Sequence, residues 1–149
     1  MREEIGTETE PPEALKMSAR LAEGTILLVE DEDTIRGLMG EVLEQAGYKV
    51  LSCACPQEGI AAGLEYAGRI DLLLTDVVMP GMNGREMANR ILEHLPELRV
   101  VFMSGYTKHT LLQQGPMEVN FEYLQKPFTL KTLTKKLAQV LGKAEELVQ

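Results

Sequence analysis

Short apolar runs alternate with amphipathic stretches along most of the chain, beginning near Thr25. Several of these runs are apolar at successive positions, which is typical of strands covered on both faces in a parallel sheet. The pattern therefore predicts strands at residues 26–29, 48–52, 72–75, 100–103 and 121–124.

Between these runs, apolar residues recur at the three-and-four spacing of one helix face. In the first such stretch they are Ile35, Leu38, Met39, Val42, Leu43 and Ala46. Asp33 is a candidate N-cap of this helix, and Gly47 is expected to end it. Further helices are predicted at residues 56–67, 84–95, 108–114 and 129–141. Five strands alternating with five helices predict an α/β fold, with a mostly parallel sheet between two helical layers.

A length of 149 residues and a hydrophobic content of 44% suit one domain with a single core. Residues 25–141 form the predicted domain. A flexible acidic leader or linker is expected at residues 1–24, and a tail without an output domain at residues 142–149. The leader could be partly helical, because residues 13–22 include good helix formers, or it could be entirely linker.

The formal net charge of −8 argues against nonspecific binding to nucleic acid, which depends on basic side chains at phosphates. No apolar run approaches the roughly 20 residues of a membrane helix, and the amino-terminal MREEIGTETE lacks the apolar core of a signal peptide. Cys53 and Cys55 are badly spaced for a disulfide and suit a reducing compartment. These features predict a cytoplasmic protein with protein partners, without direct contact to nucleic acid or membrane.

Polar residues follow four of the five predicted strands, at the edge where ligands collect in parallel sheets. Glu30 and Asp31 follow the first strand, Asp76 ends the third, Ser104 ends the fourth and Lys126 follows the fifth. Taken singly, each has an ordinary interpretation as a helix-terminal charge, a turn residue or a surface lysine. Asp76 is harder to explain in this way, because it ends an apolar run where an unpaired charge is costly.

Together these residues predict a phosphate chemistry. Three carboxylates from Glu30, Asp31 and Asp76 would repel one another unless a cation lay among them, and Mg²⁺ binds such oxygen ligands together with phosphate oxygens. An aspartate can attack phosphorus to form an acyl phosphate, in a reaction that depends largely on positioning and charge neutralisation. Lys126 could neutralise further charge, and the Ser104 hydroxyl could bond a phosphoryl oxygen.

With these residues in place, the sequence resembles the receiver domain of two-component response regulators over residues 25–141. The motifs are ILLVEDED at 26–33, LLLTDVVMPGMNG at 72–84, VVFMSGY at 100–106 and YLQKPF at 123–128. The resemblance implies a flavodoxin-like doubly wound (βα)5 fold with strand order 2-1-3-4-5, which periodicity alone does not give. That order would make the first and third strands neighbours.

The resemblance also implies roles for the acidic residues and the residue after Asp76. Asp76 matches the phosphoacceptor, Asp31 the direct metal ligand, and Glu30 the second acidic position, which often reaches the metal through water. The backbone carbonyl of Val78 matches a further ligand of Mg²⁺, with Mn²⁺ as an alternative ion. Many relatives have Asp-Asp where this chain has Glu-Asp, which could alter metal affinity.

The remaining implied roles concern the switch. Ser104 matches the hydroxyl residue that binds the phosphoryl group, Lys126 pairs with that group, and the Lys126–Pro127 bond is expected to be cis. Tyr123 matches the aromatic residue that turns inward when Ser104 moves. Such a chain would catalyse its own phosphorylation and dephosphorylation without being an enzyme in the usual sense, although a parent hybrid histidine kinase would be one.

The expected phosphodonor is a histidine kinase or a histidine phosphotransfer protein, docking near residues 35–38 and 127–128. The downstream target is not indicated, and the chain is expected to be a monomer or a weak, phosphorylation-dependent dimer. Two alternatives stay open: a haloacid-dehalogenase-type phosphohydrolase, suggested by Asp31-Glu32-Asp33, and a docking module independent of phosphorylation. The chain could be a stand-alone regulator or the carboxyl-terminal receiver of a hybrid kinase.

Overall fold

A computed structural model describes residues 23–113 and 121–142 of the chain and contains the five predicted strands and five predicted helices. The strands are β1 (Thr25–Val29), β2 (Lys49–Cys53), β3 (Leu72–Asp76), β4 (Arg99–Ser104) and β5 (Glu122–Gln125). The helices are α2 (Asp33–Gln45), α3 (Pro56–Glu65), α4 (Gly84–Leu92), α5 (Lys108–Gln113) and α6 (Leu130–Leu141). The segment 13–22, for which helix and linker were both left open, the remainder of the leader before residue 23 and the tail after residue 142 lie outside the described residues.

All strand pairs in the sheet are parallel, and the order is β2-β1-β3-β4-β5. This is the predicted order, with β1 between β2 and β3. The registers align Val29 of β1 with Thr75 of β3, and Asp76 with Met103 of β4. The carboxyl ends of β1, β3 and β4 therefore lie side by side.

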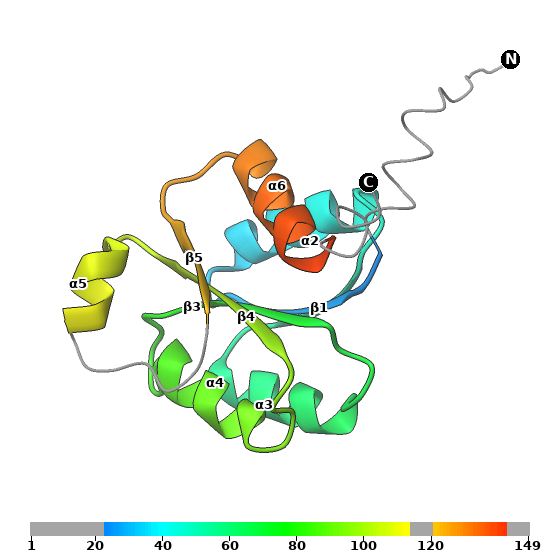
Figure 1. The fold of residues 1–149 in the computed structure, drawn as a ribbon, viewed down its shortest axis with the longest axis vertical. Helices are drawn as coiled ribbons and strands as arrows, with labels where there is room; N and C mark the ends of the chain where they lie inside the picture. Colours follow the sequence, from blue (N-terminus) through cyan, green and yellow to red (C-terminus); the bar gives the residue numbers. More distant parts are fainter. Residues whose placement is uncertain (1–22, 114–120, 143–149) are drawn as a thin grey trace, which may run out of the picture.

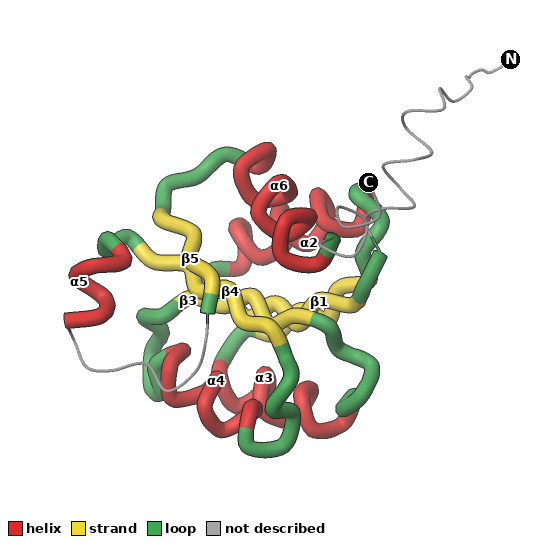
Figure 2. Tube along the Cα trace, viewed as in Figure 1, coloured by secondary structure: helices red, strands yellow, loops and turns green. Residues whose placement is uncertain are grey.

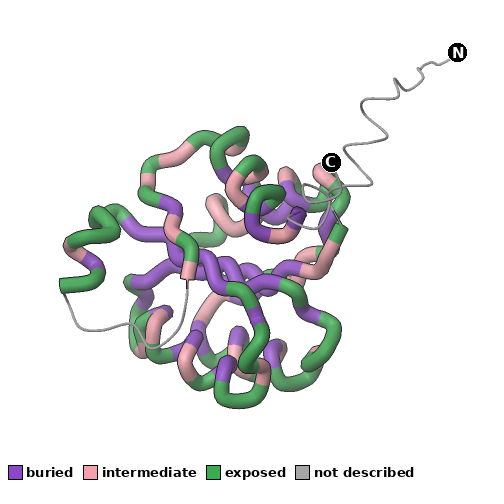
Figure 3. Tube along the Cα trace, in the orientation of Figure 1, coloured by how far each residue is buried: buried purple, intermediate pink, exposed green. Residues whose placement is uncertain are grey.

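Helices cover both faces of the sheet, with α2 and α6 on one side and α3 and α4 on the other (Figures 1 and 2). Successive strand residues alternate between the two layers: Leu27 and Leu73 pack with α3 and α4, whereas Leu28 and Leu74 pack with α2 and α6. Because both faces are buried, the central strands are almost continuously buried (Figure 3). This explains why the strands appear in the sequence as unbroken apolar runs.

In α2 the structure differs from the sequence prediction in two details, the residue that caps the helix and the exposure of Leu38. Its N-cap is Glu32, which has extended backbone angles, and Asp33 is the first helical residue. The carboxylate of Asp33 forms an ion pair with Arg36 instead of capping. Leu38 was expected on the buried face but is 48% exposed, because Met39 and Leu43 take the positions that face the sheet. Gly47 follows the helix with a φ of 112°, in agreement with its predicted role.

Gly84 allows α4 to start directly against the end of β3. Its amide donates to the carbonyl of Val77 at 2.7 Å, and a Cβ at position 84 would overlap the backbone carbonyl oxygen of Asp76. The obstruction is backbone rather than a flexible side chain, so it could be relieved only by moving α4 or the loop that carries Asp76. Gly37 in α2 is the opposite case, with open space where a Cβ would be added.

We expect Gly84→Ala to lower the free energy of unfolding by more than about 2 kcal/mol, because the loop and α4 must separate. Gly37→Ala is the matched control and should raise stability by about 0.5–1 kcal/mol, since it removes a flexible residue from an exposed helix position. Urea unfolding followed by circular dichroism measures both changes. Equal stabilities of the two variants would contradict this account of the α4 junction.

Candidate functional site

An open cleft of about 620 Å³ lies at the carboxyl ends of the strands. The residues predicted from the sequence to hold the metal and the phosphoryl group all line it: Glu30, Asp31, Asp76, Val78, Ser104 and Lys126. They come from the ends of β1, β3, β4 and β5, so the tertiary fold brings together residues up to 96 positions apart. The predicted switch residue Tyr123 lies in β5 and is not among the residues that line the cleft.

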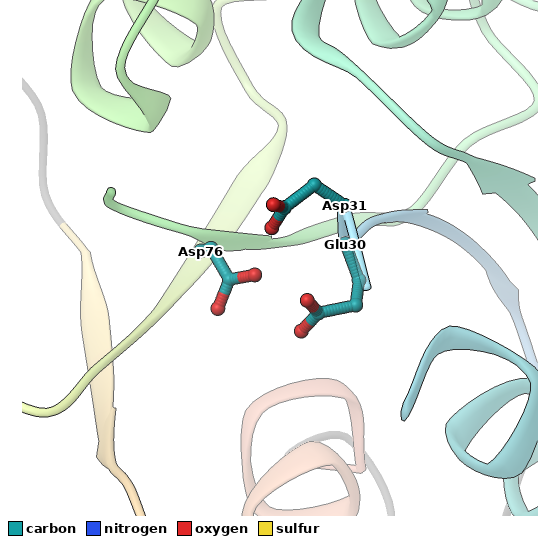
Figure 4. A group of neighbouring side chains, drawn as sticks. All are labelled: Glu30, Asp31 and Asp76. Atoms are coloured by element: carbon teal, nitrogen blue, oxygen red, sulfur yellow. The ribbon is translucent and has the colours of Figure 1, made fainter. Parts of the chain in front are cut away.

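Glu30, Asp31 and Asp76 form a carboxylate cluster in this cleft. Each offers one oxygen, and these oxygens all lie within 4.8 Å of one another. Figure 4 shows the three side chains gathered around one space, with Glu30 and Asp31 from the end of β1 and Asp76 from the end of β3. Glu30 and Asp76 are 1% and 4% exposed, whereas Asp31 is open to solvent. Hard oxygen donors that open to water on one side fit a divalent cation such as Mg²⁺.

Lys126 is the cation that contacts the two buried carboxylates. Its Nζ lies 2.6 Å from Oδ1 of Asp76 and 3.3 Å from Oε1 of Glu30. The other oxygen of Glu30, Oε2, accepts a hydrogen bond from the amide of Glu32 at 3.1 Å. The predicted cis bond between Lys126 and Pro127 is confirmed.

The buried position of Asp76 changes the proton affinity of its carboxyl. Burial and the neighbouring Glu30 raise the pKa of Asp76 from 3.8 to about 7, although Lys126 opposes the shift. For Lys126, burial lowers the pKa, but the contacts with Asp76 and the charge of Glu30 outweigh burial and leave the pKa above its ordinary value. The lysine therefore stays charged, and repulsion within the cluster is only partly neutralised.

Ser104 connects the cleft to β5 through its backbone. Its carbonyl oxygen accepts a hydrogen bond from the Tyr123 hydroxyl at 3.2 Å, and its Oγ accepts one from the amide of Tyr106 at 3.0 Å. Ser104 is buried, and Tyr123 is half-buried and packs against the core beneath β4. A displacement of Ser104 would therefore act directly on Tyr123.

Two residues that sequence analysis did not select also hold the site in place. Thr75 is fully buried, and its hydroxyl donates to the carbonyl of Asp76 at 2.9 Å. Arg36, in the first turn of α2, donates from NH1 to the carbonyl of Glu30 at 2.9 Å. Neither residue ends a strand, and both act through backbone carbonyls, so a pattern of polar residues after apolar runs does not indicate them.

The family model of the response regulator receiver domain matches residues 26–138. The chain belongs to this family. Receiver domains take phosphoryl groups from histidine kinases or phosphotransfer proteins in two-component phosphorelay systems, and they bind Mg²⁺ at an acidic site. The resemblance inferred from the four motifs is thereby confirmed, and the phosphohydrolase alternative is excluded.

Two curated relatives and two solved structures illustrate the similarity of this receiver to known ones. It is 36% identical to the sensor kinase CckA of Brucella abortus over 81% of this chain and 13% of that protein. It is 34% identical to the response regulator receiver protein CpdR of the same organism, over 78% of this chain and 95% of CpdR. The crystal structure of the receiver domain from the hybrid histidine kinase CckA matches with a TM-score of 0.69 at 37% identity, covering 79% of this chain and 99% of that one. The chemotaxis protein CheY4 of Vibrio cholerae matches with a TM-score of 0.71 at 29% identity, covering 80% of this chain and 99% of that one.

The described part of this receiver includes no helix that could cross a membrane.

The raised pKa of Asp76 predicts a pH-dependent effect of Asp76→Asn on stability without metal. The folded receiver keeps the proton to about pH 7, whereas the unfolded chain releases it near pH 4, so the carboxyl lowers stability progressively between these values. Asparagine carries no such proton. In EDTA, the variant should therefore be more stable than the wild type by about 1–3 kcal/mol at pH 8, with a much smaller difference at pH 5.

Urea unfolding at the two pH values checks this expectation. Glu97→Gln is the control, since it removes an exposed carboxyl between α4 and β4 and should change stability little at either pH. If Asp76→Asn produced the same gain at pH 5 and pH 8, the buried-carboxyl interpretation would be wrong.

Proposed function

We propose that Asp76 is the phosphoacceptor of this receiver and takes a phosphoryl group from the phosphohistidine of a kinase or phosphotransfer protein. The observation that carries the proposal is the carboxylate cluster with Lys126 against Asp76 at 2.6 Å. No other group of three potential metal-ligating residues of this kind occurs in residues 23–113 and 121–142. The cleft is open, so a partner's phosphohistidine can approach Asp76 directly.

Each residue of the cleft has a defined task in this transfer. An Asp76 carboxylate oxygen attacks the phosphorus, and an O–P bond forms as the donor's N–P bond breaks. The donor nitrogen leaves with the electron pair of that bond, as a neutral imidazole when its second nitrogen carries a proton. Lys126 offsets negative charge on one side of the phosphoryl group, and the Ser104 hydroxyl, whose oxygen accepts from the Tyr106 amide, donates its proton to a phosphoryl oxygen.

The residues that would hold Mg²⁺ are Asp31, Asp76 and the backbone carbonyl of Val78, with Glu30 close enough to act through water. When bound, Mg²⁺ supplies positive charge against the repulsion between the carboxylates and the phosphoryl oxygens. The partial neutralisation of the cluster by Lys126 alone supports this assignment. Glu30 is constrained by bonds to Lys126 and to the amide of Glu32, so the longer side chain keeps a defined place.

Acetyl phosphate with Mg²⁺ should phosphorylate the wild type but not Asp76→Asn, because the nucleophile is lost. Glu97→Gln is the control and should be phosphorylated at close to the wild-type rate, since Glu97 is exposed and does not line the cleft. Phosphate-affinity electrophoresis and mass spectrometry of peptides measure the yield and the modified residue. Phosphate on Asp31 that persists in Asp76→Asn would overturn the proposal, and an unmodified wild type would favour a docking module independent of phosphorylation.

We further propose that phosphorylation draws Ser104 toward the phosphate and lets Tyr123 turn, which reshapes the surface of α5, β5 and α6. The hydrogen bond from the Tyr123 hydroxyl to the Ser104 carbonyl supports this coupling. Phosphorylation then shifts the population between two states of this surface, rather than creating a new fold.

Ser104→Ala should uncouple these two events. Phosphorylation should become slower but still occur, because Ser104 donates to the phosphoryl group without being the nucleophile. The change that phosphorylation causes in amide exchange at Lys108–Gln113 and Glu122–Gln125 should be largely lost. Ser52→Ala, at the opposite edge of the sheet, should retain both events. A normal exchange response in Ser104→Ala would contradict the proposed coupling.

A further inference from the structure

Arg36 joins the start of α2 to the acidic residues that precede it. Its NH1 donates to the carbonyl oxygen of Glu30 at 2.9 Å, and its NH2 lies 2.7 Å from Oδ1 of Asp33. The side chain is only 21% exposed, whereas that of Asp33 is 86% exposed. The bond to the carbonyl is therefore the sheltered one of the two, and the ion pair with Asp33 is largely solvated and weak.

The bond from Arg36 completes the fixation of Glu30. The amide of Glu30 donates to the carbonyl of Cys53 at 3.1 Å, and its side-chain oxygens accept from the Lys126 amine and the Glu32 amide. Its carbonyl is the remaining polar group, and Arg36 holds it. Because a peptide group is planar, fixing the carbonyl of Glu30 also fixes the plane of the amide of Asp31.

Asp31 needs such support more than its neighbours in the cluster do. It is the exposed member of the carboxylate cluster and lies beyond the last residue of β1, so the sheet does not hold its backbone. Orientation of a metal ligand by hydrogen bonds behind it is a general determinant of metal affinity. The direction of the peptide before Asp31 sets where its carboxylate can point.

We propose that Arg36 is a positioning residue that orients Asp31 toward the metal by holding the Glu30 carbonyl. This inference rests on the proposed function, in which Asp31 is a ligand of Mg²⁺. A purely electrostatic role would have the opposite sign, because a cation beside three carboxylates repels Mg²⁺ and its removal should tighten binding. The direction of the change in metal affinity therefore separates the two roles.

The experiment compares Mg²⁺ binding to the wild type, Arg36→Met and Arg36→Lys by calorimetric or NMR titration without phosphodonor. Arg36→Met keeps an unbranched apolar stem but removes the guanidinium and with it every donor. It should weaken Mg²⁺ binding about tenfold. Arg36→Lys keeps the charge but not the two-armed guanidinium, so it should also weaken binding, to a smaller extent. Arg90→Met removes an arginine from a helical ion pair in α4 and should bind Mg²⁺ like the wild type.

A second measurement separates positioning from general damage. The phosphorylation rate of Arg36→Met should approach that of the wild type at saturating Mg²⁺, while the Mg²⁺ concentration for half the maximal rate rises about tenfold. If the wild type binds Mg²⁺ and Arg36→Met binds it as tightly or more tightly than the wild type, the proposed role of Arg36 is wrong but the proposed function is not. A wild type that binds no Mg²⁺ would overturn the proposed function, and the inference with it.

Discussion

Glu30 and Asp76 are two carboxylates almost withdrawn from water at the ends of neighbouring strands, and the amine of Lys126 contacts both. Charges in such a position are costly unless hydrogen bonds and opposite charges surround them. One lysine offsets part of this cost, and the pKa of Asp76 stays raised. Because the cluster lacks positive charge, the cleft suits a divalent cation. With that cation bound, the cleft can also accept the negative charge of a phosphoryl group.

The sheet creates this arrangement through the connections that follow β1 and β3. After β1 the chain passes to α2 on one face of the sheet, and after β3 it passes to α4 on the other face (Figure 1). Loops that diverge from adjacent strands leave a crevice between them, the usual ligand site of doubly wound sheets. Gly84 allows α4 to begin directly against the backbone of Asp76, where any larger residue would overlap the Asp76 carbonyl oxygen.

The two sides of the cleft are held differently, and this difference suits a switch. On the β1 side, Glu30 is held by hydrogen bonds with Cys53, Glu32, Arg36 and Lys126. These bonds fix the position of the acidic residues that follow β1. On the β4 side, the carbonyl of Ser104 accepts from the backbone amide of Lys126 and from the Tyr123 hydroxyl, whereas its hydroxyl oxygen accepts from the amide of Tyr106 in the following loop. In the proposed switch, a phosphoryl group on Asp76 would accept a hydrogen bond from the Ser104 hydroxyl, and the hydrogen bond between the Ser104 carbonyl and Tyr123 would pass the displacement on.

Local sequence determined the strands, most of the helices and the residues that follow the strands, because burial on both faces leaves an apolar run that ends where the chain meets solvent. It could not determine which strands are neighbours; the strand order came from the resemblance to receivers, and the tertiary structure confirms it. Two residues of α2 show what a local pattern cannot predict. Helical spacing does not locate the edge of the buried face, so Leu38 is exposed. The carboxylate of Asp33 pairs with Arg36 instead of capping the helix. The raised pKa of Asp76 and the contact between Glu30 and Lys126 exist only after folding, because both depend on burial and on distances between residues far apart in the chain.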